Sequence, residues 1–514
     1  MTTAQISTSP FGSAPERRVR PFGTPLKNIH VIQLACVTTV IITLAIISRV
    51  GMIAWPFLND SGLYAELGRT VANGNVMYRD FYETKLPGVG LLASAFWRAF
   101  GPHWAGYVLC QMVMAFLAAA ALARIARRYI SPTSRLPTFL FAIVFLNLCQ
   151  VVYTGFQLET IQAFFESLAA MAAIEAVSDD DLFATFTAGL AAGMAAMAKP
   201  GGLGVAIALA IVLVWSGRRR LIHVATLVAG VGIPTGVTLF YTIRSGAWPY
   251  LPSAMRDIQQ YATGTPLGVD AIVKVFVVLA VLGFPFLFRV RATIGGTPTL
   301  RMFVIAWFIM DLMAVLAQRR LYPYHFLPLA CPAALLYGIL SKNLKPPAIT
   351  VGLLPIAMLS LTWEGSNISK LSGGFRHMAV SDYIADHTTA NDSVFADQIG
   401  RLLIETDRKA GSRLGTFFYF VNDDDAPRRY CQTLLGDYES RKPKYLVLTD
   451  GWDRPVPALA NCNILSQCPQ RRENFIAAWA ALRDYVAVHY HLESKMDGVL
   501  IYRRSDSFEH RQNP

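Results

Sequence analysis

The residue types that can carry chemistry gather in short polar segments between long apolar blocks. The first such segment contains Asp60, and the run YRDFYETKLPG (78–88) that soon follows contains Asp80, Glu83 and Lys85. A carboxylate at a membrane boundary that faces a partly dry cavity can act as a general base. A lysine in the same loop can neutralise a phosphate as a compact cation. Asp60 can equally cap the helix expected to begin beside it, because carboxylates are favoured at that position, and the two roles are compatible.

Two further charged residues lie at the ends of apolar blocks. Glu159 is an intramembrane carboxylate, and such residues usually face a cavity or pair with a cation because an ionised group in lipid costs a few kcal/mol. Lys199 precedes the Pro-Gly-Gly break at 200–202, which places it well for contact with a phosphate. Each residue also has a structural interpretation, interface placement for Glu159 and snorkelling for Lys199.

A basic and aromatic segment, QRRLYPYHFLP, contains Arg319, Arg320, Tyr322, Tyr324 and His325. Guanidinium groups match phosphate oxygens in a forked geometry, and tyrosine and histidine add further hydrogen-bond donors. The functional interpretation is therefore an anion site. The alternative is an aromatic belt with flanking cations at the membrane surface.

The composition shows which elements must position these residues. With 54% hydrophobic and 16% charged residues, the chain has too few charges to cover a water-facing surface. Apolar blocks of about 18–25 residues, each long enough to cross a bilayer as a helix, recur along most of the chain. The sequence therefore predicts an α-helical polytopic membrane protein with about eleven spans. These lie near residues 30–55, 104–125, 136–154, 157–177, 182–198, 201–216, 221–243, 270–288, 300–317, 322–340 and 347–363.

Basic clusters predict which side of the membrane each loop occupies. With a cytoplasmic N-terminus, four clusters all fall on the inner side, as the positive-inside rule requires. They are Arg124–Arg128, Arg218–Arg220, Arg289–Arg291 and Lys342–Lys345. The apolar segment 86–100 is too short to span comfortably, so we expect it to lie at the interface. The net charge of +12 is thus explained by membrane orientation, and a nucleic-acid partner is not expected.

The predicted domain organisation has three parts. Residues 1–28 form a disordered cytoplasmic arm, 29–363 form the transmembrane domain with a long first outer loop at 56–103, and 364–514 form a small extracytoplasmic α/β domain. The expected location is the bacterial inner membrane, with the C-terminal domain in the periplasm.

Within the C-terminal domain, short apolar runs predict strands at 417–421 and 444–449 and a helix near 475–485. Asp423–Asp425 has the composition of a metal cluster, but a solvated turn is the favoured interpretation. Cys462 and Cys468 can form a disulfide if the domain is periplasmic.

Taken together, the long outer loop with an aspartate, the run YRDFYETKLPG, Glu159, Lys199-Pro200 and the segment Tyr322–Pro328 resemble the GT-C membrane glycosyltransferases. The similarity is to bacterial members of the protein-O-mannosyltransferase and lipid A aminoarabinose-transferase group. The resemblance implies transfer of a sugar from a polyprenyl-phosphate donor to a lipid, glycan or protein acceptor at the bilayer surface.

The resemblance also implies roles for single residues. In that family the first-loop aspartate binds or activates the acceptor, which corresponds to Asp60. A lysine in a Lys-Pro-Pro segment contacts the lipid phosphate, which corresponds to Lys85, although Leu86 here replaces one proline. The acidic residue of the fourth span corresponds to Glu159, and the tyrosine-rich segment before the tenth span to Tyr322, Tyr324 and His325.

A cofactor is not required by these features. Some family members use a divalent metal held by a glutamate just before the lysine, but here that position is Thr84, with Glu83 one residue earlier. A metal is therefore doubtful. No Gly-rich phosphate loop follows a strand in the membrane domain, so a nucleotide-binding fold is not expected.

Two rival functions remain from the sequence. A transporter or flippase of a lipid-linked glycan would also use broken spans and intramembrane charges. A scaffold without chemistry would leave the grouping of Asp60, Asp80, Glu83 and Lys85 unexplained. The sugar, the acceptor and the oligomeric state cannot be read from the sequence.

Overall fold

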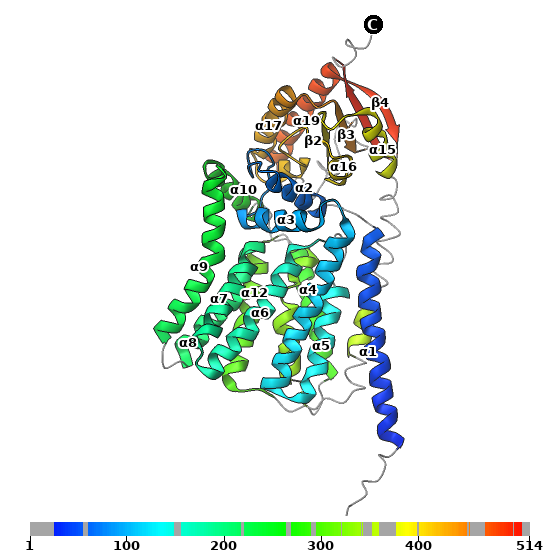
Figure 1. The fold of residues 1–514 in the computed structure, drawn as a ribbon. Helices are drawn as coiled ribbons and strands as arrows, with labels where there is room; N and C mark the ends of the chain where they lie inside the picture. The colour runs from blue at the N-terminus through cyan, green and yellow to red at the C-terminus, as the bar shows by residue number, and fades with distance from the viewer. Residues whose placement is uncertain are drawn as a thin grey trace, which may run out of the picture.

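The computed structural model is a helical bundle with an α/β domain at one end (Figure 1). It describes residues 25–54, 60–148, 156–216, 220–263, 269–288, 295–319, 321–340, 342, 352–358, 377–397, 400–449, 452, 468–496 and 498–505. The disordered arm predicted at 1–28 and Cys462 of the predicted disulfide lie outside these residues, apart from the first turn of α1.

The bundle helices coincide with the apolar blocks of the sequence. Their bounds are α1 Pro25–Gly51, α4 Trp104–Ile125, α5 Arg135–Ile143, α6 Leu158–Asp179, α7 Leu182–Ala198, α8 Gly204–Ser216, α9 Arg220–Arg244, α11 Val269–Gly283, α12 Pro298–Ala317 and α13 Ala330–Leu340. Apolar side chains lie on all faces of most of these helices, as expected for helices that contact lipid on one side and other helices on the other.

Four described helices are long and apolar enough to cross a membrane, namely Trp104–Ile130, Leu158–Asp179, Leu221–Arg244 and Pro298–Ala317. Shorter apolar helices lie at Ala35–Val50, Leu182–Ala198, Pro200–Trp215, Ile272–Leu287 and Ala330–Leu340. These helices support a membrane protein. The total of about eleven spans, and the orientation, stay predictions.

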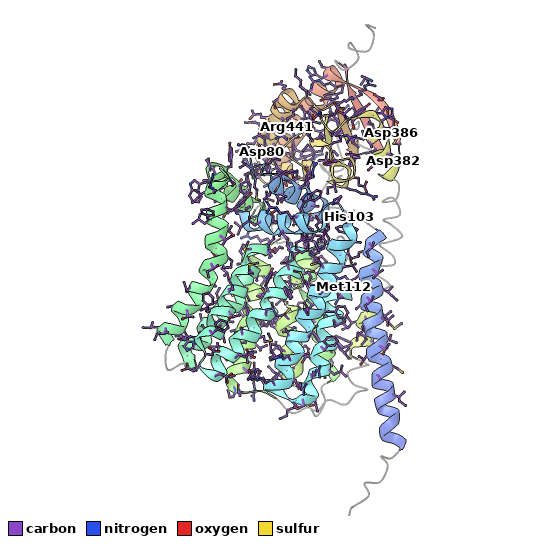
Figure 2. All side chains as sticks on the ribbon, in the orientation of Figure 1. Asp80, His103, Met112, Asp382, Asp386 and Arg441 are labelled. Atoms are coloured by element: carbon purple, nitrogen blue, oxygen red, sulfur yellow. The ribbon has the colours of Figure 1, made fainter. Side chains whose placement is uncertain are left out.

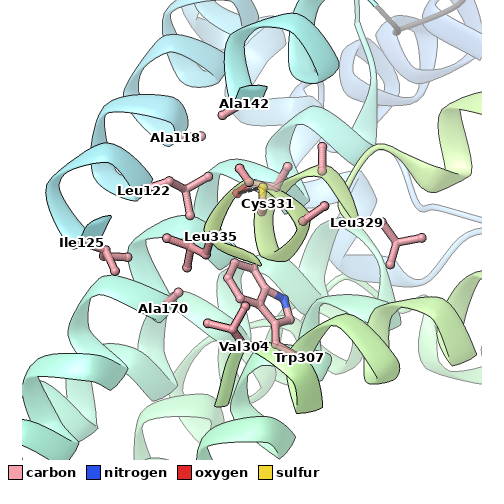
Figure 3. Packing of buried hydrophobic residues seen from close by; sticks show 14 of the residues in the cluster. Ala118, Leu122, Ile125, Ala142, Ala170, Val304, Trp307, Leu329, Cys331 and Leu335 are labelled. Atoms are coloured by element: carbon pink, nitrogen blue, oxygen red, sulfur yellow. Dashed lines mark hydrogen bonds between the residues drawn. The ribbon is translucent and has the colours of Figure 1, made fainter. Parts of the chain in front are cut away.

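Small residues bring the bundle helices together. A Cβ atom added at Gly189 of α7 would lie 2.3 Å from the carbonyl oxygen of Leu227, and one at Gly230 of α9 would lie 2.3 Å from that of Phe186. The two backbones therefore touch directly, which is how helices in lipid gain packing without a hydrophobic driving force. Around α12 and α13 the core is filled by larger side chains, including Trp307, as Figure 3 shows.

Two short helices lie across one end of the bundle (Figure 1). These are α2, Asp60–Ala72, and α3, Pro87–Phe100. A Cβ atom at Gly68 of α2 would lie 2.4 Å from the carbonyl oxygen of Ala93 in α3, so the two helices pack closely. At 14 residues α3 is short for a span, as the sequence indicated. A third helix outside the bundle, α10, Leu251–Thr263, follows α9 at the same end.

The C-terminal domain contains a five-stranded sheet of order β2-β1-β3-β5-β4. The strands are β1 Ser393–Ala396, β2 Lys409–Ala410, β3 Tyr445–Thr449, β4 Tyr490–Met496 and β5 Val499–Arg504, and the helices are α15 His377–His387, α16 Gly400–Thr406, α17 Ala426–Arg441 and α19 Pro469–His489. β1 pairs in parallel with β2 and β3, and β5 pairs antiparallel with β3 and β4.

The sequence correctly predicted the strand β3 and the helix α19, but the prediction for 417–421 was wrong. Phe417–Val421 is a 3-10 helix, η10. The backbone N–H of Phe417 donates to the carboxylate of Asp397, at the end of β1, over 3.0 Å. This bond turns the chain at the start of the apolar run, and the run packs beside the sheet without joining it.

One hydrophobic core joins the segment between α1 and α4, predicted to be the first outer loop, to the C-terminal domain. Tyr82, Phe96, Phe417 and Trp479 belong to the same buried cluster. Figure 2 shows Asp80 and Arg441 close together at this boundary, where Arg441 Nη2 donates to the carbonyl oxygen of Asp80 over 3.2 Å. The loop and the domain therefore pack as one unit at the end of the bundle.

Candidate active site

A cavity of about 650 Å³ lies between the end of the bundle and the C-terminal domain. Its walls come from α2, the chain between α2 and α3, the first turn of α6, the end of α7, α10, the end of α12 and the 3-10 helix Pro323–Phe326. Thr416 and Tyr419 close it from the C-terminal domain. Segments that are far apart in the sequence thus meet at one place.

Asp60 is the first residue of α2 and lines the cavity. It lies within the first turn of the helix, where a carboxylate meets the positive end of the helix dipole. The hydroxyl of Tyr324 donates to Asp60 Oδ2 over 3.3 Å. This bond joins two residues of the cavity wall that are 264 positions apart in the sequence.

Glu83 and Lys85 form a pair on the loop between α2 and α3. Lys85 Nζ lies 3.3 Å from Glu83 Oε1, and the hydroxyl of Tyr419 donates to Glu83 Oε2 over 3.1 Å. The loop is held by Tyr78, whose hydroxyl donates to the carbonyl oxygen of Lys85 over 2.7 Å and whose φ is 72°. The Glu83 side chain is buried, whereas that of Lys85 is 26% exposed and faces the cavity.

Glu159 and Lys199 form a second pair on the bundle side of the cavity. Glu159 lies in the first turn of α6, and Lys199 is the residue at which α7 ends. Lys199 Nζ makes an ion pair with Glu159 Oε1 and donates to Gln318 Oε1 over 3.1 Å. The ammonium also lies 6.0 Å from the ring centre of Tyr324.

Three rings of the aromatic segment form a stack at the cavity wall. The rings of Tyr322 and Tyr324 are parallel with centres 5.5 Å apart, and the ring of His325 meets both edge-on. All three residues line the cavity. The stack fixes the direction of the Tyr324 hydroxyl, which donates to Asp60.

The charges of the cavity are unequal. Glu83 is paired with Lys85, and Glu159 with Lys199. Within the part of the chain that the structure describes, Asp60 makes no ion pair and accepts a hydrogen bond from Tyr324. Of the three carboxylates, Asp60 is therefore the one that is available to take a proton from a substrate.

Not every residue expected at the site reaches the cavity. Asp80 lies outside it, where its carboxylate accepts from Arg79 and from the backbone N–H of Val76. The bond with Arg79 lowers the pKa of Asp80. Arg319 is exposed and is not among the lining residues. Arg320 lies outside the described residues.

The sequence interpretation missed several lining residues. Tyr64 lies one turn after Asp60 and is buried, and a helical wheel would have placed the two on one face. Burial and then the nearby carboxylates, Asp60 foremost, raise the pKa of Tyr64 well above its usual value. Gln157 and Gln318 are also lining residues that the sequence did not single out. Tyr419 gave no signal, because its place depends on how the C-terminal domain docks.

The described residues hold no group of three or more histidine, cysteine, aspartate or glutamate side chains arranged to bind a metal ion. In the Asp423–Asp425 segment, Asp423 pairs with Arg429 at 2.8 Å and Asp424 pairs with Arg471 at 3.1 Å. Asp423 and Asp424 therefore form ion pairs within the C-terminal domain.

Comparison with known proteins gives two similarities. Residues 84–241 match the family described as dolichyl-phosphate-mannose-protein mannosyltransferase. Among solved structures, arabinosyltransferase EmbB from Mycobacterium smegmatis aligns with 63% of this chain, at 17% sequence identity and a TM-score of 0.41. That alignment covers 32% of the EmbB chain, so this protein matches about a third of its length. No curated protein sequence matches the chain.

Proposed function

We propose that this protein is a GT-C membrane glycosyltransferase and transfers a sugar at the membrane. The match of residues 84–241 to a mannosyltransferase family supports this proposal. The proposed donor is a polyprenyl-phosphate-linked sugar, and the proposed acceptor is a hydroxyl of a lipid, glycan or protein at the outer face. The observation that carries the proposal is a cavity in which Asp60, a carboxylate that makes no ion pair among the described residues, shares the walls with two lysines.

In the proposed reaction the acceptor hydroxyl attacks the anomeric carbon of the sugar. The new bond is the glycosidic C–O bond, and the bond that breaks joins the anomeric carbon to the phosphate oxygen. Asp60 takes the acceptor proton, and the bonding electrons leave with the polyprenyl phosphate. Negative charge therefore grows on the phosphate, where Lys85 and Lys199 stabilise it more strongly in the transition state than in the bound donor.

The walls of the cavity suit such a donor. Apolar side chains of Ile258, Ala314 and Ala317 lie on the side formed by α10 and α12, and the charged pairs lie elsewhere on the wall. An isoprenoid chain can occupy the apolar part while its phosphate meets the lysines. Phosphate binding here needs no nucleotide fold, because the leaving group is already attached to a lipid.

The test is transfer of a radiolabelled sugar from a polyprenyl-phosphate donor pool in membranes that contain the protein. Asp60→Asn should lower the rate by roughly 10²- to 10⁴-fold, the usual contribution of a general base. Lys85→Ala should lower it by a comparable factor through the lost charge. Asp80→Asn is the matched control, because Asp80 lies on the same loop outside the cavity.

The three variants together test whether the chemistry lies at Asp60 and Lys85. Loss in the two cavity variants with normal transfer by Asp80→Asn supports the proposal. Full transfer by Asp60→Asn and Lys85→Ala would show that the chemistry lies elsewhere.

A transporter or flippase of a lipid-linked glycan is the second candidate, and one observation favours it. Glu166 of α6 and Asp311 of α12 are carboxyl residues buried at 0% and 1% exposure within the bundle. Such residues often mark substrate or ion paths through membranes. A transporter needs access from both faces. Movement of a lipid-linked glycan across proteoliposomes without any sugar transfer would favour this candidate over the glycosyltransferase.

A further inference from the structure

The C-terminal domain reaches the cavity through one tyrosine. Tyr419 lies in η10, is 3% exposed, and lines the cavity. Its hydroxyl lies 3.1 Å from Glu83 Oε2 and 3.3 Å from the carbonyl oxygen of Tyr82. The ring of Tyr82 packs edge-on against that of Tyr419, with centres 5.5 Å apart. The hydroxyl is thus fixed against the first outer loop.

Glu83 connects this tyrosine to a lysine of the cavity. One carboxylate oxygen, Oε2, accepts from Tyr419, and the other, Oε1, lies 3.3 Å from Lys85 Nζ. The Glu83 side chain is only 4% exposed, so water cannot replace a lost partner easily. Without the tyrosine hydroxyl, Oε2 would be left unsatisfied, and the carboxylate would gain by turning toward the lysine. The Lys85 ammonium would then be drawn out of its present position at the cavity wall.

Several other contacts hold the C-terminal domain at this end of the bundle, on α10. Tyr430 donates to Asp257 of α10 over 3.0 Å, and Arg429 pairs with the same carboxylate at 3.1 Å. The hydroxyl of Tyr82 also donates to Asp257. Docking of the domain therefore does not depend on the Tyr419 hydroxyl, and the bond to Glu83 has a consequence that can be separated from docking.

We propose that Tyr419 is a positioning residue that acts through Glu83 to hold Lys85 at the donor phosphate. The C-terminal domain is thereby part of the active site. This inference rests on the proposed function, since Lys85 is the residue assigned there to the phosphate. The attraction between Lys85 and the phosphate strengthens as negative charge develops on the leaving group. Displacement of Lys85 therefore slows turnover more than it weakens donor binding.

The experiment uses the full-length protein in detergent and the variant Tyr419→Phe, which keeps the ring and removes the hydroxyl. Sugar transfer gives kcat and KM, and binding of decaprenyl phosphate, read from intrinsic fluorescence, gives a measure that needs no turnover. We expect kcat to fall by roughly 10- to 100-fold, the usual effect of losing a hydrogen bond to a charged group. Decaprenyl phosphate should bind several-fold more weakly, because it carries the charge of the departed leaving group.

Two comparisons separate positioning from a general structural effect. In Tyr383→Phe the same kind of bond is lost, a tyrosine hydroxyl donating to Glu493 over 2.6 Å in the same domain but away from the cavity. That variant should keep normal kcat and phosphate binding. In a Lys85→Ala background, Tyr419→Phe should cause no further loss, because the residue through which it acts is gone.

The outcomes distinguish the two proposals. Normal kcat and phosphate binding in Tyr419→Phe would overturn the positioning role while leaving the transferase intact. Equal, additive losses with and without Lys85 would also overturn it. If wild type bound decaprenyl phosphate but transferred no sugar, the proposed function would fail, and the binding comparison would still test Tyr419. If Tyr419→Phe failed to fold, Glu83→Gln would replace it. That variant keeps an acceptor for Tyr419 but not the charge facing Lys85, and unchanged phosphate binding by it would contradict the proposal.

Discussion

Replacing Asp397 with asparagine should stabilise the C-terminal domain at pH 8. Asp397 lies at the end of β1, is 2% exposed, and accepts the backbone N–H of Phe417. Burial raises the pKa of its carboxyl group from 3.8 to about 7, and hydrogen bonds from Phe417 and Thr416 oppose this only in part. The folded domain therefore holds this proton over a pH range in which the unfolded chain has released it.

The direction in which stability changes with pH follows from the number of protons that the folded and unfolded states bind. Between about pH 4 and pH 7 the folded state binds more protons than the unfolded state, so stability decreases as the pH rises and levels off above the folded pKa. The shift of roughly three pKa units corresponds to about 4 kcal/mol at most, at about 1.4 kcal/mol per unit. An asparagine keeps an oxygen for the Phe417 N–H and carries no charge, so it removes this loss.

The assay is thermal unfolding of the full-length protein, followed by tryptophan fluorescence between pH 5 and pH 8. Trp452 and Trp479 are buried beside the ring of Phe417 and report on this region. We expect the wild-type Tm to fall as the pH rises, and the Asp397→Asn Tm to stay level and lie roughly 5–15 °C above wild type at pH 8. Asp382→Asn, an exposed change in the same domain, should follow wild type. A wild-type Tm that rises between pH 5 and pH 8 would refute the reasoning.

Two further predictions concern the bundle. Glu159→Gln should leave the largely buried Lys199 ammonium without its carboxylate partner. We expect the free energy of unfolding to fall by about 3–5 kcal/mol, with a lower Tm in detergent. An unchanged Tm would mean that the pair is solvated. Gly230→Val should separate α9 from α7, because its Cβ would lie 2.3 Å from the Phe186 carbonyl oxygen, and the yield of folded protein should fall sharply in size-exclusion chromatography. Gly236→Val in the same helix, where nothing lies within 4 Å, should be tolerated, and equal yields for both would contradict the packing argument.

The parts of the site that could be predicted from the sequence are those governed by local rules. Glu159 and Lys199 stand out because charges at the ends of apolar blocks are costly and need a reason. Asp60 and Lys85 stand out because a polar loop between such blocks is unusual. Their pairing with particular partners could not be predicted, since Lys199 is bonded to Gln318, 119 residues further along the chain.

Other parts of the structure depend on tertiary contacts that no local pattern contains. Asp80 has the same residue type and loop as Asp60, yet its carboxylate bonds to Arg79 and to the Val76 N–H, which turns it away from the cavity. The apolar run 417–421 has the composition of a strand, but the bond between Asp397 and Phe417 begins a 3-10 helix there. The contribution of Tyr419 to the cavity follows from this turn, so it could not be foreseen.

The shared core of the first outer loop and the C-terminal domain has a consequence for biosynthesis. Tyr82 and Tyr419 are bonded across 337 residues of chain. At about 5–20 residues per second, the ribosome needs roughly 20–70 seconds to make that stretch. The aromatic side chains of the loop that the C-terminal domain later buries stay exposed during this time, while the helices that follow are synthesised. The cavity is therefore assembled last, and a chain released early from the ribosome lacks the part of its wall that Thr416 and Tyr419 supply.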